Sequence, residues 1–424
     1  MKASHKNTKI EYKWFIVVLA FLMVFVAMGF CNSVKSLFIA PVTRALHIER
    51  GLFSINDSVR FIATAVVNIF FGSLINRFGA KKLICAGFAC LISSQIIYSL
   101  ASNVYLFYVG GMLLGVGLSW TTTTMVGAIV NKWCKENKGA IMGGVFAASG
   151  LGGSVAIQLV TPVIGSGTFG FRNAYRLSAL VLAITLVIIM LFYKDKSADE
   201  NGKESKTQSK KSHGHDWQGI SFERALKMPY FYCTLVCIFI TGMVLQSVSG
   251  VAAAHMGDSG LNAACVSNVL SVHFLALTLF KFLVGFIYDK TGIRTTVSVC
   301  AITAVVVMVL LVFISDSFMG KLFAVLYGLL SAVALPMETI MLPIYAGEFF
   351  GQKSFNKILG IFVSVNTAGY ALGAPVINFI FDKCGSYNQG FIMCGCLMLV
   401  TIIALQFLIN KAHHYQKNLS VTER

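Results

Sequence analysis

Long apolar stretches recur along almost the whole chain, and short polar segments separate them. Each stretch is long enough to cross the roughly 30 Å hydrocarbon core of a bilayer as a helix, which takes about 20 residues. Runs such as 14–30 and 301–314 are apolar on every side instead of alternating with period two, which favours helices over barrel strands. The pattern predicts twelve spans, near 14–39, 53–75, 83–102, 105–130, 139–163, 173–193, 228–252, 266–288, 296–314, 321–346, 357–381 and 388–410.

The predicted spans fall into two sets of six, and one long polar stretch, KDKSADENGKESKTQSKKSHGHD, lies between the sets. This stretch is poor in apolar residues and rich in charge, so we expect a flexible cytoplasmic linker. Its two histidines, His213 and His215, are expected to be solvated. The chain therefore divides into an N-terminal six-helix bundle at 1–193, a linker at 194–227 and a C-terminal six-helix bundle at 228–424.

Two loops repeat one pattern of residues. The loop after the second span reads GSLINRFGAKK, and the loop after the eighth reads GFIYDKTGIRT. At one constant spacing, Gly72, Asn76, Arg77 and Gly79 match Gly285, Asp289, Lys290 and Gly292. A second repeat matches Gly152 in span five with Gly369 in span eleven. The predicted fold is therefore an all-α membrane protein with twelve transmembrane helices in two pseudo-symmetric six-helix bundles.

Composition and charge agree with a membrane location. Of the 424 residues, 56% are hydrophobic and only 12% are charged, about half the charged fraction of a soluble domain. The net charge of +17 does not indicate nucleic acid binding, because the 34 lysines and arginines lie mostly in short loops between spans. Their distribution places both termini in the cytoplasm by the positive-inside rule. We expect a multi-pass protein of the inner or plasma membrane.

The sequence lacks patterns of catalysis and of metal binding. Its eleven cysteines are scattered, mostly within spans, without a metal-ligand spacing. No span holds a nucleophile with a base at helical spacing, an HExxH motif or paired acids. We therefore expect no enzyme, no metal and no cofactor.

The two repeated loops resemble the signature of the major facilitator superfamily, in which a glycine ends one helix and an acid, a base and a second glycine turn the chain. The resemblance implies a monomeric transporter that works by alternating access, with these loops as conformational latches. Asn76 stands where the first loop usually has an acid. The N-terminal latch is therefore expected to be weaker than the C-terminal latch at Asp289.

The segment WCKENKGAIMGGVFAASGLGG at 133–153 resembles the branch that contains the oxalate/formate antiporters and the monocarboxylate transporters. Cys134 stands where that branch usually has a second aromatic residue. An arginine typical of sugar porters early in span four is replaced by Gly111, which argues against a drug or sugar porter. The resemblance implies a small organic anion as substrate, similar to lactate, pyruvate or formate.

Ionisable side chains inside spans are functional candidates, because each costs at least a few kcal/mol there. Lys281 lies in span eight, about 12 Å from its cytoplasmic end, where the resemblance implies a substrate-binding arginine. The alternative is a lysine that snorkels to the interface. Lys35 in span one matches a lysine of the monocarboxylate transporters and either binds substrate or attracts anions to the outer mouth. The antiporters carry a second cation where Asn366 stands here, which favours a monocarboxylate over oxalate.

Glu338 is an acid that the spans place about 15 Å deep in the bilayer, at a level similar to Lys281. The usual proton-linked acid of the family is replaced by Leu277, so Glu338 is the candidate for proton coupling. The alternative is that Pro336 and Pro343 open a break in the helix, where Glu338 only caps the freed backbone groups.

Other polar residues in the spans have weaker signals. Asp57 and Arg60, three residues apart at the external end of span two, are expected to pair with each other. Six further residues either line a cavity or form hydrogen bonds between helices: Asn32, Asn68, Gln158, Gln246, His273 and Tyr370.

The predicted function is secondary active transport of a small monocarboxylate by alternating access with proton symport. Lys281, Asn366 and Lys35 would bind the anion, and Glu338 would carry the proton. One alternative is carboxylate exchange of the oxalate/formate type. Another is a membrane-embedded sensor without transport, which would need an output domain. The expected partners are the anion, a proton or counter-anion, and the lipid bilayer.

Overall fold

The computed structural model describes residues 4–133, 138–194, 220–338, 340–351 and 354–422, and these residues form helices joined by short connections. The helices of the first half are α1 (Ser4–Met28), the π-helix η1 (Gly29–Ser33), α2 (Lys35–Leu46), α3 (Arg50–Phe78), α4 (Ala80–Leu100), α5 (Val104–Thr121), α6 (Thr123–Trp133), α7 (Lys138–Ile164) and α8 (Gly170–Phe192). Those of the second half are α10 (Phe222–Leu226), α11 (Pro229–Asp258), α12 (Ala263–Val312), α13 (Phe318–Ala334), the 3-10 helix η3 (Leu335–Glu338), α14 (Met341–Phe350), α15 (Phe355–Cys384) and α16 (Asn388–Thr422).

The prediction of an all-α protein with twelve spans is confirmed. Twelve helical segments of the described chain are long and apolar enough to cross a membrane, from Tyr12–Leu46 to Asn388–Ala412. Spans eight and nine both lie within α12, as the candidate spans Ala263–Lys281 and Phe286–Val312. A kink at Gly292, which departs from helical geometry, separates the two long helical parts of α12. The predicted linker and its histidines lie mostly outside the described residues, which resume at Ile220.

Contacts between helices divide the described chain into two compact units, and each is considered by itself. The first unit holds the residues up to Lys35 and those from Ile62 to the end of the first half. The second holds Ser36–Phe61 and the second half of the chain. The boundaries of the bundles at 1–193 and 228–424 stay a prediction from the sequence.

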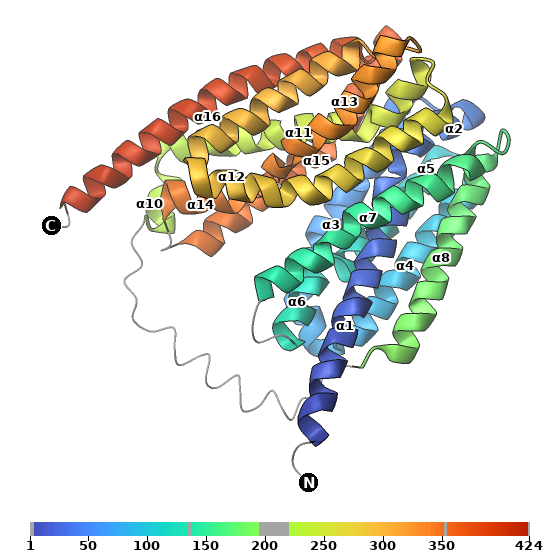
Figure 1. Ribbon diagram of the computed structural model, residues 1–424, viewed down its shortest axis with the longest axis horizontal. Helices are drawn as coiled ribbons and strands as arrows, with labels where there is room; N and C mark the ends of the chain where they lie inside the picture. The colour runs from blue at the N-terminus through green and yellow to red at the C-terminus, as the bar shows by residue number, and fades with distance from the viewer. Residues whose placement is uncertain (1–3, 134–137, 195–219, 339, 352–353, 423–424) are drawn as a thin grey trace. The chain divides into compact units, whose positions relative to one another are not determined.

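Each unit repeats the same set of helix pairs. In the first unit α1 packs on α7, and α4 packs on α5 and α8; in the second, α11 packs on α15, and α12 packs on α13 and α16 (Figure 1). Glycines of the predicted repeat allow the closest of these approaches. A Cβ atom on Gly152 of α7 would collide with the backbone oxygen of Phe25, and one on Gly369 of α15 would collide with that of Phe239. The two matched glycines therefore each allow the backbone of a neighbouring helix to approach closely, one in each unit.

Spans four and ten are each built from two helices. In span four, Thr122, with φ −122° and ψ −133°, separates α5 from α6. In span ten, η3 separates α13 from α14, and Pro336 lies within it. Breaks at corresponding spans of the two halves are the structural counterpart of the sequence repeat.

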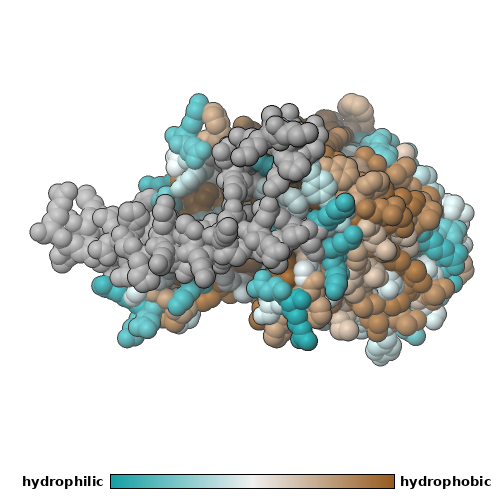
Figure 2. Space-filling model, turned by 90° about the horizontal axis from the view of Figure 1, so that it is seen from below, coloured by the Kyte–Doolittle hydropathy of each residue, from teal (hydrophilic) through white to brown (hydrophobic). Residues whose placement is uncertain are grey.

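Large apolar side chains reach the surface of the described helices, as expected where lipid replaces water. Ile69 is 77% exposed, Phe318 83% and Ile403 71%. Figure 2 shows wide brown areas of hydrophobic residues on the face in view, beside teal residues that are hydrophilic. The surface composition agrees with a protein that is solvated by a bilayer.

Candidate substrate and gating sites

The matched loop glycines share one unusual backbone conformation. Gly79 has φ 80° and ψ 161°, and Gly292 has φ 77° and ψ 176°. Residues with a Cβ atom rarely adopt this region, which is essentially restricted to glycine. One such residue in each half turns the chain between two long helices, between α3 and α4 and within α12.

The other matched residues of the loops are surface residues where their side chains are described. Arg77 and Lys290 lie over the neighbouring rings of Phe78 and Phe286, at 5.3 Å and 4.4 Å from the ring centroids. Asn76 and Asp289 are exposed, and a Cβ atom on Gly72 would meet nothing within 4 Å, so Gly72 supports no close helix approach among the described residues. The latch role of these loops, Gly285 included, stays a prediction.

The two predicted cations are half-buried. Lys281 lies on α12 in the second unit, at the end of the candidate span Ala263–Lys281. Lys35 is the first residue of α2 and the last residue of the first unit, directly after the π-helix and Val34. Widened turns of this kind are frequent at functional sites.

Asn366 lies between two packed helices instead of on an open surface. It is 4% exposed on α15, and a Cβ atom on Gly242 of α11 would lie 2.5 Å from its Oδ1 atom. Asn366 also lines a small pocket with Thr241 and Tyr345, whose buried hydroxyl has no hydrogen bond partner among the described residues. A substrate contact by Asn366 stays a prediction, and it would require access through this interface.

Glu338 is the last residue of η3, at the break in span ten. The backbone N–H of Ile340 donates to the carbonyl of Pro336 at 2.8 Å, so part of the backbone is hydrogen-bonded again across the break. The Glu338 side chain lies outside the described part of the chain, and its role in proton coupling stays a prediction. The predicted pair of Asp57 and Arg60 is confirmed, with Nε of the arginine 3.2 Å from Oδ1 of the aspartate.

A buried ionic cluster that sequence reasoning missed lies inside the second unit. The Arg50 side chain is 7% exposed and donates twice to Asp258, once at 3.0 Å from Nη2 to Oδ1 and once over a short contact from Nη1 to Oδ2. Its Nη1 atom also donates to the hydroxyl of Tyr387 at 2.9 Å, and its guanidinium lies 4.0 Å from the ring centroid of Phe381. Asp258 accepts a further bond from the exposed Arg44 at 2.6 Å. The charge of Arg50 is therefore paired at a largely buried site, with a carboxylate that it shares with Arg44.

The same cluster caps the N-terminus of α3. The two carboxylate oxygens of Asp382 accept the first two backbone N–H groups of α3 at 3.1 Å and 2.6 Å, where a helix leaves donors unpaired and favours negative charge. Burial raises the pKa of Tyr387, so its hydroxyl stays protonated and donates to Asn378 at 2.7 Å. The Asn378 amide in turn donates to Ser54 at 2.8 Å.

Nothing in the sequence links these partners, because Arg50 and Asp258 are 208 residues apart and each follows an apolar run, where a charge indicates topology. The positions become informative only when α3, α11 and α15 are known to pack together. A polar residue at the end of a span carries the same local signal whether it is solvated or paired.

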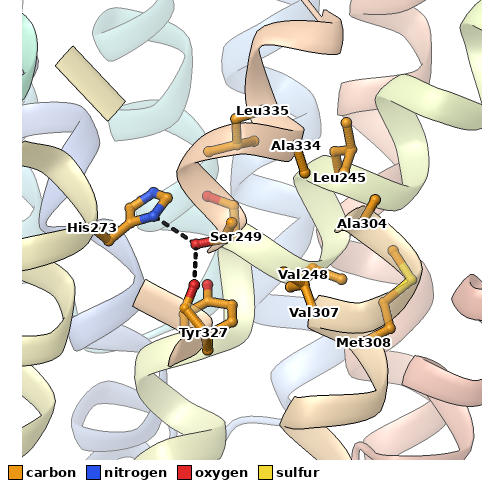
Figure 3. Close-up of a pocket in the computed structure, with 11 residues that line it drawn as sticks. Leu245, Val248, Ser249, His273, Ala304, Val307, Met308, Tyr327, Ala334 and Leu335 are labelled. Atoms are coloured by element: carbon orange, nitrogen blue, oxygen red, sulfur yellow. Dashed lines mark hydrogen bonds between the residues drawn. The ribbon is translucent and has the colours of Figure 1, made fainter. Parts of the chain in front are cut away.

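A small cavity within the second unit is lined by α11, α12, α13 and η3 (Figure 3). Its volume is about 10 Å³, which is room for about one water molecule. Its polar lining consists of Ser249, His273, Tyr327 and Ser331. His273 is only 3% exposed and forms a hydrogen bond from α12 to Ser331 on α13, at 2.7 Å. Of the two roles expected for His273, the structure shows the hydrogen bond between helices. A place in a substrate cavity stays a prediction.

The described residues thus form a multi-pass helical membrane protein in which two sets of six spans repeat one arrangement of pairs and breaks. This is an architecture of secondary transporters. The sequence matches the profile of the Major Facilitator Superfamily over residues 17–336 and again over 234–424, and the chain belongs to that family. It is a transporter and not an enzyme.

Several characterised and uncharacterised transporters are distant relatives over most of their length. The uncharacterized MFS-type transporter YcxA of Bacillus subtilis is 22% identical over 421 residues, which cover 95% of this chain and 96% of YcxA. The sialic acid transporter NanX of Escherichia coli is 21% identical, with 86% of each chain covered. Human monocarboxylate transporter 2 is 21% identical, with 95% of this chain and 86% of that protein covered. A multidrug resistance protein of Bacillus subtilis is similar to the same degree, at 21% identity over 91% of this chain and 92% of that protein.

Solved structures of other transporters share this fold. A mutant of the nucleoside transporter NupG superposes with a TM-score of 0.77 at 12% sequence identity, covering 93% of this chain and 99% of NupG. At this identity the likeness concerns the fold alone.

Proposed function

We propose that this secondary active transporter moves a small monocarboxylate together with a proton. The observation that carries the proposal is Lys281, a half-buried ammonium group in a candidate span. The resemblance to the carboxylate branch implies an arginine at this position. Two relatives, named for sialic acid and for monocarboxylates, support an anionic substrate. The multidrug relative is similar to the same degree, and its name does not support this substrate class.

Lys281 supplies the charge that recognises the carboxylate. An ammonium group is a compact charge with three donors, whereas a guanidinium offers a planar fork, so carboxylates of different shape would be accepted. Lys35 and Asn366 are the additional binding candidates. Proton coupling would make transport of a monovalent anion electroneutral. Glu338 is the candidate for the coupling group that the sequence offers, and variants of Glu338 and of a buried histidine distinguish the two candidates below.

Uptake by the purified full-length protein in proteoliposomes tests the proposal. Radiolabelled lactate, pyruvate and formate are each offered with and without an inward-directed proton gradient. We expect uptake of at least one acid, and faster uptake with the gradient. Gradient-independent uptake that is stimulated by a preloaded carboxylate would contradict symport and indicate exchange.

The substitution Lys281→Ala tests the binding role. Loss of a charge partner of a bound anion costs about 2–5 kcal/mol, so uptake at low substrate concentration should fall at least about tenfold. The control is Lys321→Ala, which removes a lysine that is 45% exposed and paired with Asp316 at 2.8 Å. Lys281→Arg should retain uptake because it keeps the charge. Undiminished uptake by the alanine variant at position 281 would exclude this residue as the anion site.

A further inference from the structure

His273 is a buried titratable group that the sequence does not single out for proton transfer. It lies on α12, eight residues before Lys281, and therefore about 12 Å from it along the helix axis. It borders the cavity that has room for about one water molecule. A buried imidazole beside a space of this size is able to exchange a proton with a water molecule if one ring nitrogen carries a free lone pair.

The hydrogen bonds around the ring determine which nitrogen that is. The hydroxyl of Ser331 lies 2.6 Å from the carbonyl oxygen of Tyr327, and a carbonyl only accepts, so the hydroxyl hydrogen is directed there. The Ser331 oxygen must then accept from Nδ1 of His273, at 2.7 Å. Nδ1 is also 3.3 Å from the carbonyl oxygen of Gly328, a second acceptor. The hydrogen of the neutral ring is therefore on Nδ1.

The other nitrogen, Nε2, then carries the lone pair. The hydrogen bonds that the described residues give to His273 run through Nδ1. Figure 3 shows the second ring nitrogen on the side of the imidazole away from the dashed bonds. Fixing one nitrogen as the donor leaves the other as the place for an incoming proton.

The groups that face His273 do not hold it permanently charged. From α13, Tyr327 stacks on the imidazole with ring centroids 6.3 Å apart, and it is the titratable residue of the cavity lining besides His273 itself. From α11 the lining contributes Leu245, Val248 and Ser249. From η3 it contributes Leu335, and the side chain of Glu338 on the same element lies outside the described part of the chain. On α12 the charged neighbour is Lys281.

We propose that Nε2 of His273 binds the proton that travels with the carboxylate. The inference rests on the proposed anion site at Lys281. A carboxylate bound at Lys281 adds a negative charge close to the same buried helix, so it favours protonation of the imidazole. Release of the anion removes that charge and favours loss of the proton. Anion binding and protonation are then linked reciprocally.

The charges balance in this cycle. One hydronium ion gives a proton to the Nε2 lone pair and becomes water on the loading side, and imidazolium returns the proton to water on the unloading side. The carboxylate contributes one negative charge, so one proton and one anion cross together with no net charge. No other covalent bond forms or breaks.

The test separates coupled accumulation from exchange in proteoliposomes of the full-length protein. With a gradient of one pH unit, one proton per anion allows accumulation of lactate, pyruvate or formate of about tenfold. The variant His273→Gln should take up the same acid only to equilibrium, while exchange of labelled for unlabelled acid continues because it needs no net proton movement. The matched control His255→Gln should accumulate like the wild type, because His255 is also buried but its Nε2 is bonded to the carbonyl of Leu311 at 2.7 Å.

Failure of this inference is distinguishable from failure of the proposed function. Gradient-driven accumulation by His273→Gln equal to the wild type would overturn the inference while the carboxylate function stands. The same holds if Glu338→Gln alone abolishes accumulation. A wild-type protein that takes up none of the three acids would overturn the proposed function, and with it the linkage to Lys281.

A spectroscopic measurement checks the proton acceptor without any substrate. In protein labelled with ¹⁵N-histidine, the signal of His273 is assigned by its loss in His273→Gln. We expect the neutral Nδ1–H tautomer, with Nε2 unprotonated. A neutral Nε2–H tautomer would overturn the proposal whatever the protein transports.

Discussion

At the residue scale, the backbone of Gly79 and Gly292 explains why the repeated loops keep a glycine at this place. The φ angles of 80° and 77° lie in a region where a Cβ atom meets the neighbouring backbone. The first glycine of the motif behaves differently, because Gly72 lies inside α3 and a Cβ atom there would meet nothing within 4 Å. The backbone conformation therefore requires glycine at the second position of the motif, whereas neither conformation nor packing requires it at Gly72.

Alanine substitutions should distinguish the glycines that the backbone conformation requires from Gly72. Gly79→Ala and Gly292→Ala should each destabilise the protein by about 1–3 kcal/mol through backbone strain. Gly72→Ala should be neutral or stabilising by up to about 1 kcal/mol, because alanine is the better helix former. Thermal unfolding of the detergent-solubilised proteins measures the difference. Equal losses at all three positions would contradict the conformational argument.

Residue spacing predicted the matched glycines because a conformational requirement acts on the residue itself. The tautomer of His273 was not predictable in this way. It depends on the Ser331 hydroxyl, 58 residues further along the chain, and on a carbonyl of α13 that orients that hydroxyl. Only the packing of α12 against α13 brings these atoms together.

At the element scale, the N-terminus of α3 is held by residues from distant helices. Asp382 of α15 accepts the first two N–H groups of α3, and Asp258 of α11 pairs with the buried guanidinium of Arg50. A charged hydrogen bond of this kind is worth more than one between exposed groups. The first turns of α3 therefore depend on the second half of the chain for their stability.

Two arginines that share Asp258 allow a matched comparison. Arg50→Ala should destabilise the protein by about 2–3 kcal/mol, because it removes charged hydrogen bonds from a buried site. Arg44→Ala should change stability by less than about 1 kcal/mol, because its side chain is 69% exposed. Hydrogen exchange of the amides at 50–54 should quicken only in the first variant. Similar exchange in both variants would show that burial does not matter here.

The helices themselves were largely predictable, because membrane thickness sets the length of an apolar run regardless of its neighbours. Where the structure adds detail to the predicted spans, single backbone positions are the cause. Gly292 kinks the chain within α12, and Thr122 divides span four into two helices. Neither residue changes the hydrophobic pattern, so hydropathy alone does not reveal them.

At the scale of the whole molecule, the distribution of lysines and arginines predicts that both termini face the cytoplasm. A fluorescent protein fused after Arg424 should therefore fluoresce in intact cells. Alkaline phosphatase inserted between α4 and α5, at Ser102, should be active outside the cytoplasm. A C-terminal fusion that does not fluoresce, together with an inactive phosphatase at Ser102, would reverse the orientation.

The candidate site was predictable only in part at this scale. Lys281 was proposed as the anion site because a cation in an apolar span is conspicuous in the sequence itself. The Arg50 cluster was not, because a charge at the end of a span has an ordinary explanation in topology. Asn366 was identified by its position in a resemblance, and the structure adds that it is packed against Gly242.

The π-helix at Gly29–Ser33 has a mechanical consequence. It ends just before Lys35, where the chain passes from the first unit to the second within one continuous span. The chain passes back at Phe61 and Ile62, within α3. Both crossings are made by helices, which resist stretching. Because π-type turns are common places for a helix to bend, we expect this span to bend beside Lys35 more easily than elsewhere.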